Sequence, residues 1–238
     1  MPRVDRSRDA VDVCAIAFVA IQLVLFPLIQ FTPADPSAFW SYVSIVLVVA
    51  MAFVAFGGAP SGYFIKAGLV FTLVADYFLV IDAERLLEGV LAFILVQAAY
   101  FAYLFVNEPR RSVRIANALL RTVGSLILSV LAIFVLGEDA DALTVASVLY
   151  YANLIINAVF AFMLGKRARV FAIGLVLFAM CDLCIGLEVL FSQYLASDAL
   201  SFFYGARLNL PWVFYQPSQV LIAMYLYLMH RRAHVKRV

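Results

Sequence analysis

Eight long apolar runs constrain this chain more than any other feature of its sequence. A stretch of about 19 residues is needed to cross the hydrocarbon core of a bilayer as a helix. Runs of that length lie at 11–31, 39–57, 62–82, 86–106, 113–136, 142–164, 170–192 and 210–230. Turn-forming or charged residues separate them. The first run is too long for the apolar part of a signal peptide and lacks a small-residue cleavage site.

The composition agrees with this segmentation. The chain is 66% apolar and 13% charged, whereas soluble domains are about 25% charged. Lipid offers no hydrogen bonds to the backbone, so runs of this kind cross the membrane as helices. We therefore predict an all-α polytopic membrane bundle of eight transmembrane helices, which forms a single transmembrane domain over residues 1–238.

The basic residues predict the orientation of the bundle. Thirteen of the 17 lysines and arginines lie before the first run, between the fourth and fifth, between the sixth and seventh, or after the last. An even number of spans puts all four groups on one side. The positive-inside rule then makes both termini cytoplasmic. The pattern fits a bacterial cytoplasmic membrane, and an endoplasmic reticulum membrane is the alternative. The long external connection at 193–209 is predicted to hold a short interfacial segment.

Two aspartates interrupt the apolar runs, Asp76 in the third and Asp182 in the seventh. An ionised carboxylate inside a bilayer costs about 2.5–3.5 kcal/mol or more, so both side chains are expected to face the bundle interior. The alternative is a structural hydrogen bond or an ion pair with Lys66 or Arg121. We expect those two cations to lie near the cytoplasmic ends of their spans and to extend toward the headgroups.

Other polar side chains recur at similar depth and on single helical faces. If these faces converge, they form one polar pocket around the aspartates. Taken singly, each amide is equally explained by a hydrogen bond to a neighbouring helix. The residues are Gln97 and Tyr100; Tyr150, Asn153 and Asn157; and Tyr215, Gln216 and Gln219.

Two neighbouring carboxyl groups in an apolar pocket are suited to acid–base chemistry. The charged form of each is poorly solvated, so one can donate a proton while the other accepts one. Such a pair serves cleavage through an oxocarbenium-like species, as in glycoside hydrolysis. Vinyl ethers break by related chemistry, and a substrate already in the bilayer needs no soluble domain.

We predict no cofactor, no metal ion and no nucleic-acid partner. Cys181 and Cys184 form a C-x-x-C spacing, but no second Cys/His pair accompanies them. His230 and His234 belong to a basic tail.

Four segments, in order, resemble the YhhN/TMEM86 family of membrane proteins, whose animal members include lysoplasmalogenase. They are AGLVFTLVADYFLVI (67–81), LLEGVLAFILVQAAYFAYLF (86–105), GLVLFAMCDLCIGLEVL (174–190) and YQPSQVLI (215–222). Asp76 and Asp182 match the family's two acidic positions. Further matches are Gly89, Phe93, Tyr100, Phe178, Tyr215 and Gln219.

The resemblance implies a hydrolase that releases a fatty aldehyde from a lysophospholipid with a vinyl ether bond. Asp76 and Asp182 would handle the proton. The expected substrate contacts are Gln97, Tyr100, Tyr150, Asn153, Tyr215 and Gln219.

The chain also departs from the family pattern. Gln97 stands where the family usually has His and cannot titrate; Ala75 and Cys181 replace the residues that usually precede the two aspartates. A lipid-binding or transport protein on the same fold is therefore the alternative, and a proton-coupled carrier is a third.

Overall fold

The structure is a computed structural model in which every regular element of the described residues is helical. It describes residues 6–55, 60–82, 84–137, 140–194 and 208–235. The elements are α1 (Arg6–Phe31), α2 (Ala34–Val54), α3 (Gly62–Asp76), η1 (Tyr77–Ile81), α4 (Leu86–Asn107), α5 (Arg111–Leu119), η2 (Leu120–Gly124), α6 (Ser125–Leu136), α7 (Ala142–Met163), η4 (Gly165–Arg167), α8 (Arg169–Tyr194) and α10 (Leu210–Val235).

These elements join into eight long helical columns, which confirms the predicted all-α bundle. The third column is α3 continued by η1, and the fifth is α5, η2 and α6 in succession. Among the described residues, seven columns are long and apolar enough to cross a membrane by length and composition alone. The eighth, α10, has the length but carries Gln216, Ser218 and Gln219, which are all buried in the bundle. A helix whose polar side chains face neighbouring helices can cross a membrane with fewer apolar residues, because those polar side chains do not contact lipid.

The predicted boundary before the second column is wrong by several residues. The connection expected between the runs 11–31 and 39–57 is shorter, because α2 begins at Ala34, directly after Pro33. Pro36 lies in the first helical turn, where its missing N–H leaves no hydrogen bond unmade. The interfacial segment expected at 193–209 falls almost wholly outside the described residues.

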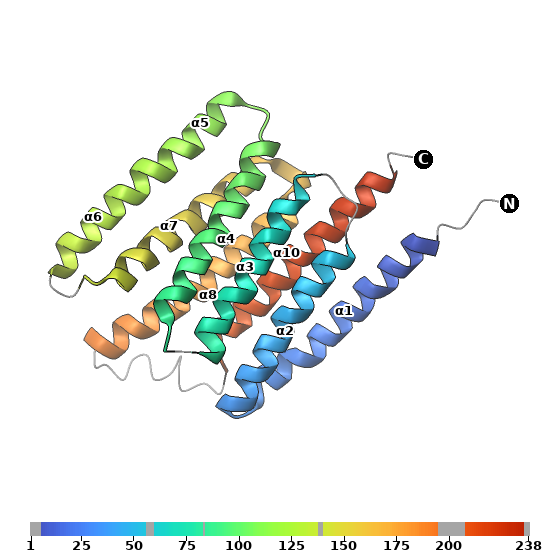
Figure 1. Cartoon of the computed structure of the whole chain (residues 1–238), viewed down its shortest axis with the longest axis horizontal. Helices are drawn as coiled ribbons and strands as arrows, with labels where there is room; N and C mark the ends of the chain where they lie inside the picture. The colour runs from blue at the N-terminus through green and yellow to red at the C-terminus, as the bar shows by residue number, and fades with distance from the viewer. Residues whose placement is uncertain (1–5, 56–59, 83, 138–139, 195–207, 236–238) are drawn as a thin grey trace.

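The columns form two layers flanked by two outer helices (Figure 1). One layer is α2, α3 and α4, and the other is α10, α8 and α7; α2 and α3 contact α10, and α4 contacts α7. The outer helices are α1, against α2 and α10, and α6, against α7. The column from Arg111 to Leu136 is the least buried of the candidate spans. Buried polar side chains of α3, α4, α7 and α10 gather in the interior between the two layers, and the half-buried Asp182 of α8 joins them.

Glycines permit the closest approaches between columns. A Cβ atom on Gly68 would lie 2.3 Å from Cε1 of Tyr100, so the Tyr100 ring lies directly on the α3 backbone. A Cβ atom on Gly174 would lie 3.2 Å from the backbone oxygen of Ser218 on α10. Small residues at helix contacts are the usual means of close packing in membranes.

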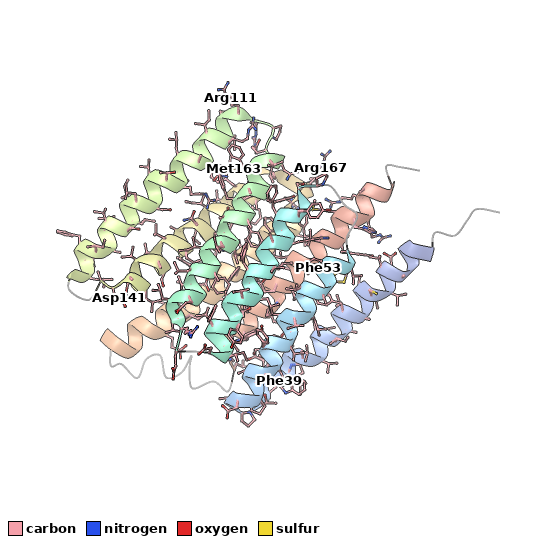
Figure 2. All side chains as sticks on the ribbon, viewed as in Figure 1. Phe39, Phe53, Arg111, Asp141, Met163 and Arg167 are labelled. Carbon is pink, nitrogen blue, oxygen red and sulfur yellow. The ribbon has the colours of Figure 1, made fainter. Side chains whose placement is uncertain are left out.

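Both ends of the described chain lie at the same end of the bundle (Figure 1). Figure 2 shows Arg111 and Arg167 toward that end and Asp141 and Phe39 toward the other. This is the arrangement that an even number of spans requires, and it puts Arg111 and Arg167 at the same end as the termini (Figure 2). The positive-inside rule predicts that this end is cytoplasmic.

Glu108 and Arg110 close the turn between α4 and α5 at the same end. Arg110 donates to Glu108 Oε1 from its backbone N (3.0 Å) and Nε (2.7 Å), and to Oε2 from Nη2 (2.9 Å). These hydrogen bonds lower the pKa of the Glu108 carboxyl. Arg110 also reaches the carbonyl oxygen of Met163, which ties the turn to the end of α7.

Candidate active site

Asp76 lies in the interior of the bundle at the end of α3. Its side chain is buried, and both of its carboxylate oxygens accept a hydrogen bond from the hydroxyl of Tyr215 on α10, at 2.8 and 2.7 Å. One phenol therefore spans both oxygens and holds the carboxylate in a single orientation. The prediction that Asp76 faces the interior is confirmed.

The backbone changes directly after this aspartate. Residues Tyr77–Ile81 form the π-helical turn η1, in which the N–H of Asp82 bonds to the carbonyl oxygen of Tyr77 at 2.9 Å. Gly89 of α4 permits this wider turn to pack, because a Cβ atom there would lie 2.6 Å from Leu79. Short π-helical turns inside helices often accompany functional residues.

Asp182 lies on α8 and is held by a second tyrosine. The hydroxyl of Tyr150 on α7 donates to Asp182 Oδ2 at 2.5 Å. Phe178 of α8 packs against both tyrosine rings, with its centroid 5.3 Å from that of Tyr215 and 6.2 Å from that of Tyr150, so the two tyrosine–carboxylate pairs are neighbours. The structure thus brings together four residues from four helices. We call Asp76, Tyr215, Asp182 and Tyr150 the carboxylate cluster.

Aromatic rings surround the carboxylate cluster. Phe93 of α4 stacks on the Tyr150 ring with centroids 5.2 Å apart, and Phe178 of α8 lies 5.3 Å from the Tyr215 ring. The Phe93 and Phe178 rings meet edge to face at 5.4 Å. Both phenylalanines are buried. Asp76 is therefore buried among aromatic rings with a phenol as its hydrogen-bond partner, whereas Asp182, also bonded to a phenol, is half-buried.

A second polar cluster lies beside the first, toward α6. The Arg121 guanidinium donates from Nη1 to Asn153 Oδ1 and from Nη2 to Asn157 Oδ1, the latter at 2.7 Å. Asn157 in turn donates to Gln97, at 2.9 Å to Oε1 and 3.0 Å to the backbone oxygen. We call Arg121, Asn153, Asn157 and Gln97 the arginine–amide cluster. The expectation that Arg121 extends toward the headgroups is wrong, because these amides hold it inside the bundle.

Tyr100 and Gln219 lie deeper among the helices. Both are fully buried; the Tyr100 ring meets Phe171 edge to face at 5.3 Å. The Gln219 side chain is one turn from Tyr215 along α10, and it donates only a long 3.5 Å hydrogen bond to Ser218 Oγ. Its Oε1 has no hydrogen-bond partner among the described residues.

Gln216 points away from both clusters, so the predicted polar face of the last span divides in two. Its Nε2 donates to Gln22 of α1, at 2.7 Å to Oε1 and 2.9 Å to the backbone oxygen. Ser44 of α2 donates to the same Gln22 Oε1 at 2.7 Å. Gln22 and Ser44 are not among the residues predicted from the sequence. Their one indication in the sequence is that each is a polar residue within an apolar run. Together with Gln216 they form a third polar cluster, which joins α1, α2 and α10.

A comparison with known proteins identifies the family of the chain. The model of the YhhN family matches residues 36–226, which include every member of the carboxylate and arginine–amide clusters. Neither the search of curated proteins nor that of solved structures finds a match. The family match covers well over half of the chain, and the chain is a membrane protein of the YhhN family.

Proposed function

We propose that this chain is a membrane-embedded hydrolase that cleaves the vinyl ether bond of lysoplasmalogens. Its products would be a fatty aldehyde and a glycerophospho-base. The observation that carries the proposal is the carboxylate cluster. It holds two acidic side chains, each hydrogen-bonded to a phenol, and both phenol rings pack against the same ring, Phe178.

The chemistry follows from the pair. One carboxyl group, protonated, delivers its proton to the vinyl carbon remote from the ether oxygen, which leaves an oxocarbenium ion. The other, ionised, accepts a proton from the water that adds to this cation. The resulting hemiacetal collapses: its hydroxyl loses a proton, the bond to the glycerol oxygen breaks, and that oxygen is protonated. One water is consumed, and both carboxyl groups can regain their starting states.

The apolar surroundings suit this reaction. Phe93 and Phe178 pack against the tyrosines that hold the acids, and the carboxyl group of Asp76 is buried, so its electrostatic interaction with the cationic intermediate is strong. Tyr150 and Tyr215 would orient the acids and would contact the substrate. Of the other expected substrate contacts, Asn153 and Gln219 lie one helical turn from Tyr150 and Tyr215 along α7 and α10, and Gln97 and Tyr100 lie on α4.

Product analysis tests the proposal. The purified protein is incubated with 1-alkenyl lysophosphatidylethanolamine and, separately, with its saturated 1-alkyl analogue, and fatty aldehyde is measured by mass spectrometry. We expect aldehyde from the alkenyl lipid alone, and its loss in both Asp76→Asn and Asp182→Asn. Asparagine keeps the size and an acceptor oxygen for the tyrosine, so folding should survive.

Asp141→Asn is the matched control. Asp141 caps α7 by accepting a hydrogen bond from the Thr144 N–H at 2.7 Å, and asparagine caps a helix as well. This variant should keep full turnover. An absence of aldehyde from folded protein that still binds the lipid would reject the hydrolase and favour a lipid-binding or transport protein. Proton-coupled uptake into proteoliposomes would favour a carrier.

A further inference from the structure

Arg121 is a cation held within a membrane-spanning column. It lies in η2, the second π-helical turn, which joins α5 to α6. Both of its terminal nitrogens donate to amide oxygens of α7, and its guanidinium lies over the Phe101 ring at 4.5 Å. These contacts direct the side chain toward α7 and α4 and away from the headgroups.

The charge of Arg121 is not balanced by the residues that hold it. In the part of the chain that the structure describes, the ion pairs involve Arg85, Arg110 and Arg231, and no carboxylate pairs with Arg121. Amide oxygens satisfy hydrogen bonds but carry no net charge. A cation kept away from water without a counter-ion is costly. This arrangement is explained if an anion binds beside it.

The cluster also has more donors than acceptors. Gln97 is 1% exposed, and its Oε1 is occupied by Asn157, but its Nε2 has no partner among the described residues. The Nε of Arg121 is likewise buried without a described partner. These two donor nitrogens and the positive charge of the guanidinium would together suit a ligand group that has several acceptor oxygens. Phosphate has this chemistry, and arginine is the side chain that binds it most specifically.

The cluster lies at a suitable place relative to the carboxylates. Asn153 and Asn157 follow Tyr150 along α7 by three and seven residues, which corresponds to about 5 and 10 Å of helical rise. Tyr150 contacts Asp182. In a lysophospholipid the glycerol backbone alone separates the ether oxygen from the phosphate, and this spacer is of comparable length.

We propose that Arg121, Asn153, Asn157 and Gln97 bind the phosphate of a lysophospholipid whose ether bond lies at Asp76 and Asp182. The proposal rests on the proposed function for the identity of the lipid. It adds a specificity site: the cluster selects a phosphate-bearing lipid over a neutral glycerol ether with the same chain.

Binding tests the site without any need for turnover. Purified full-length protein is titrated with non-cleavable 1-alkyl lysophosphatidylethanolamine and with 1-alkylglycerol, which lacks the phosphate. Arg121→Gln should weaken binding of the phospholipid about tenfold or more and leave alkylglycerol binding unchanged. Arg121→Lys keeps the charge but not the planar fork, so its affinity should be intermediate.

Arg114→Gln is the matched control, because Arg114 lies two turns earlier in the same column and over a different ring, Phe105. It should bind both lipids as the unaltered protein does. Equal losses for both lipids in Arg121→Gln, or no loss for either, would overturn the phosphate site. Thermal unfolding of each variant shows whether an equal loss of binding for both lipids comes from misfolding. If Arg121→Gln is misfolded, the comparison of the two lipids is made with Arg121→Lys instead.

Competition distinguishes the sources of phosphate. Displacement of the lysophospholipid by inorganic phosphate or by a diacyl phospholipid at similar concentration would overturn the assignment to a substrate headgroup. With alkenyl substrates, Arg121→Gln should raise KM for the lysophospholipid about tenfold more than KM for alkenylglycerol, which lacks the phosphate. A chain without turnover whose phospholipid binding still depends on Arg121 would refute the hydrolase and retain the phosphate site.

Discussion

The hydroxyl of Tyr215 lies 2.8 and 2.7 Å from the two carboxylate oxygens of Asp76, although 139 residues separate them in the chain. The contact joins the third helical column to the last and orients the acid. Replacement of Tyr215 by Phe removes the hydroxyl and keeps the ring against Phe178. A hydrogen bond to a charged group contributes about 1.5–3 kcal/mol, so we expect aldehyde release to fall about 10- to 100-fold.

Tyr225→Phe provides the control for Tyr215→Phe. Tyr225 is a buried tyrosine of the same helix, and its hydroxyl contacts that of Tyr103 on α4. Its loss should lower thermal stability and leave the rate per folded molecule unchanged. Equal effects of the two variants on that rate would argue against a role of Tyr215 in orienting Asp76.

Gly68→Ala should destabilise the bundle. The added Cβ atom would lie 2.3 Å from the Tyr100 ring, and that ring is fully buried against Phe171 and has no room to retreat. Overpacking of this kind costs about 1–3 kcal/mol. We expect a lower unfolding temperature in detergent. Gly186→Ala, at a position with no neighbouring atom within 4 Å, should be neutral or stabilising; a loss there as large as at Gly68 would contradict the packing argument.

The Glu108–Arg110 turn predicts a pH dependence of stability. The hydrogen bonds from Arg110 lower the pKa of Glu108, so the carboxylate contributes stability above the ordinary glutamate pKa. This contribution is lost as the pH falls through the lowered pKa of the folded state. Unfolding temperatures of the unaltered protein and of Glu108→Gln should therefore differ at neutral pH and converge in acid. A difference that grows on acidification would contradict this sign.

Cysteine labelling tests the orientation of the bundle. In a Cys14→Ala background the two remaining native cysteines, Cys181 and Cys184, are buried. An impermeant maleimide added to intact cells should label Asp35→Cys, in the first turn of α2, and not Ser112→Cys, at the start of α5. Both positions are exposed. Permeabilised cells should show labelling at both positions, and the reverse pattern in intact cells would invert the assigned topology.

The apolar runs predicted all eight columns, because a bilayer imposes a minimum length on any helix that crosses it. Their ends were less predictable. Pro33 and Pro36 suggest a long turn, yet proline is compatible with a first helical turn, and α2 begins between them. The π-helical turns at Tyr77–Ile81 and Leu120–Gly124 have no signature in the hydropathy pattern.

The sequence by itself determined that Asp76 and Asp182 are inside the bundle, because an ionisable group has no stable place against lipid. It did not determine their partners. Helical spacing predicted that Tyr215, Gln216 and Gln219 share one face. In the structure Gln216 hydrogen-bonds to Gln22 of α1, whereas Tyr215 hydrogen-bonds to Asp76 of α3. The Arg121 side chain could extend to the headgroups or hydrogen-bond to a neighbouring helix. It does the latter because α7 places amide oxygens within its reach. Periodicity is a property of one helix, but a hydrogen bond between helices depends on how two of them are rotated and placed, which tertiary packing alone sets.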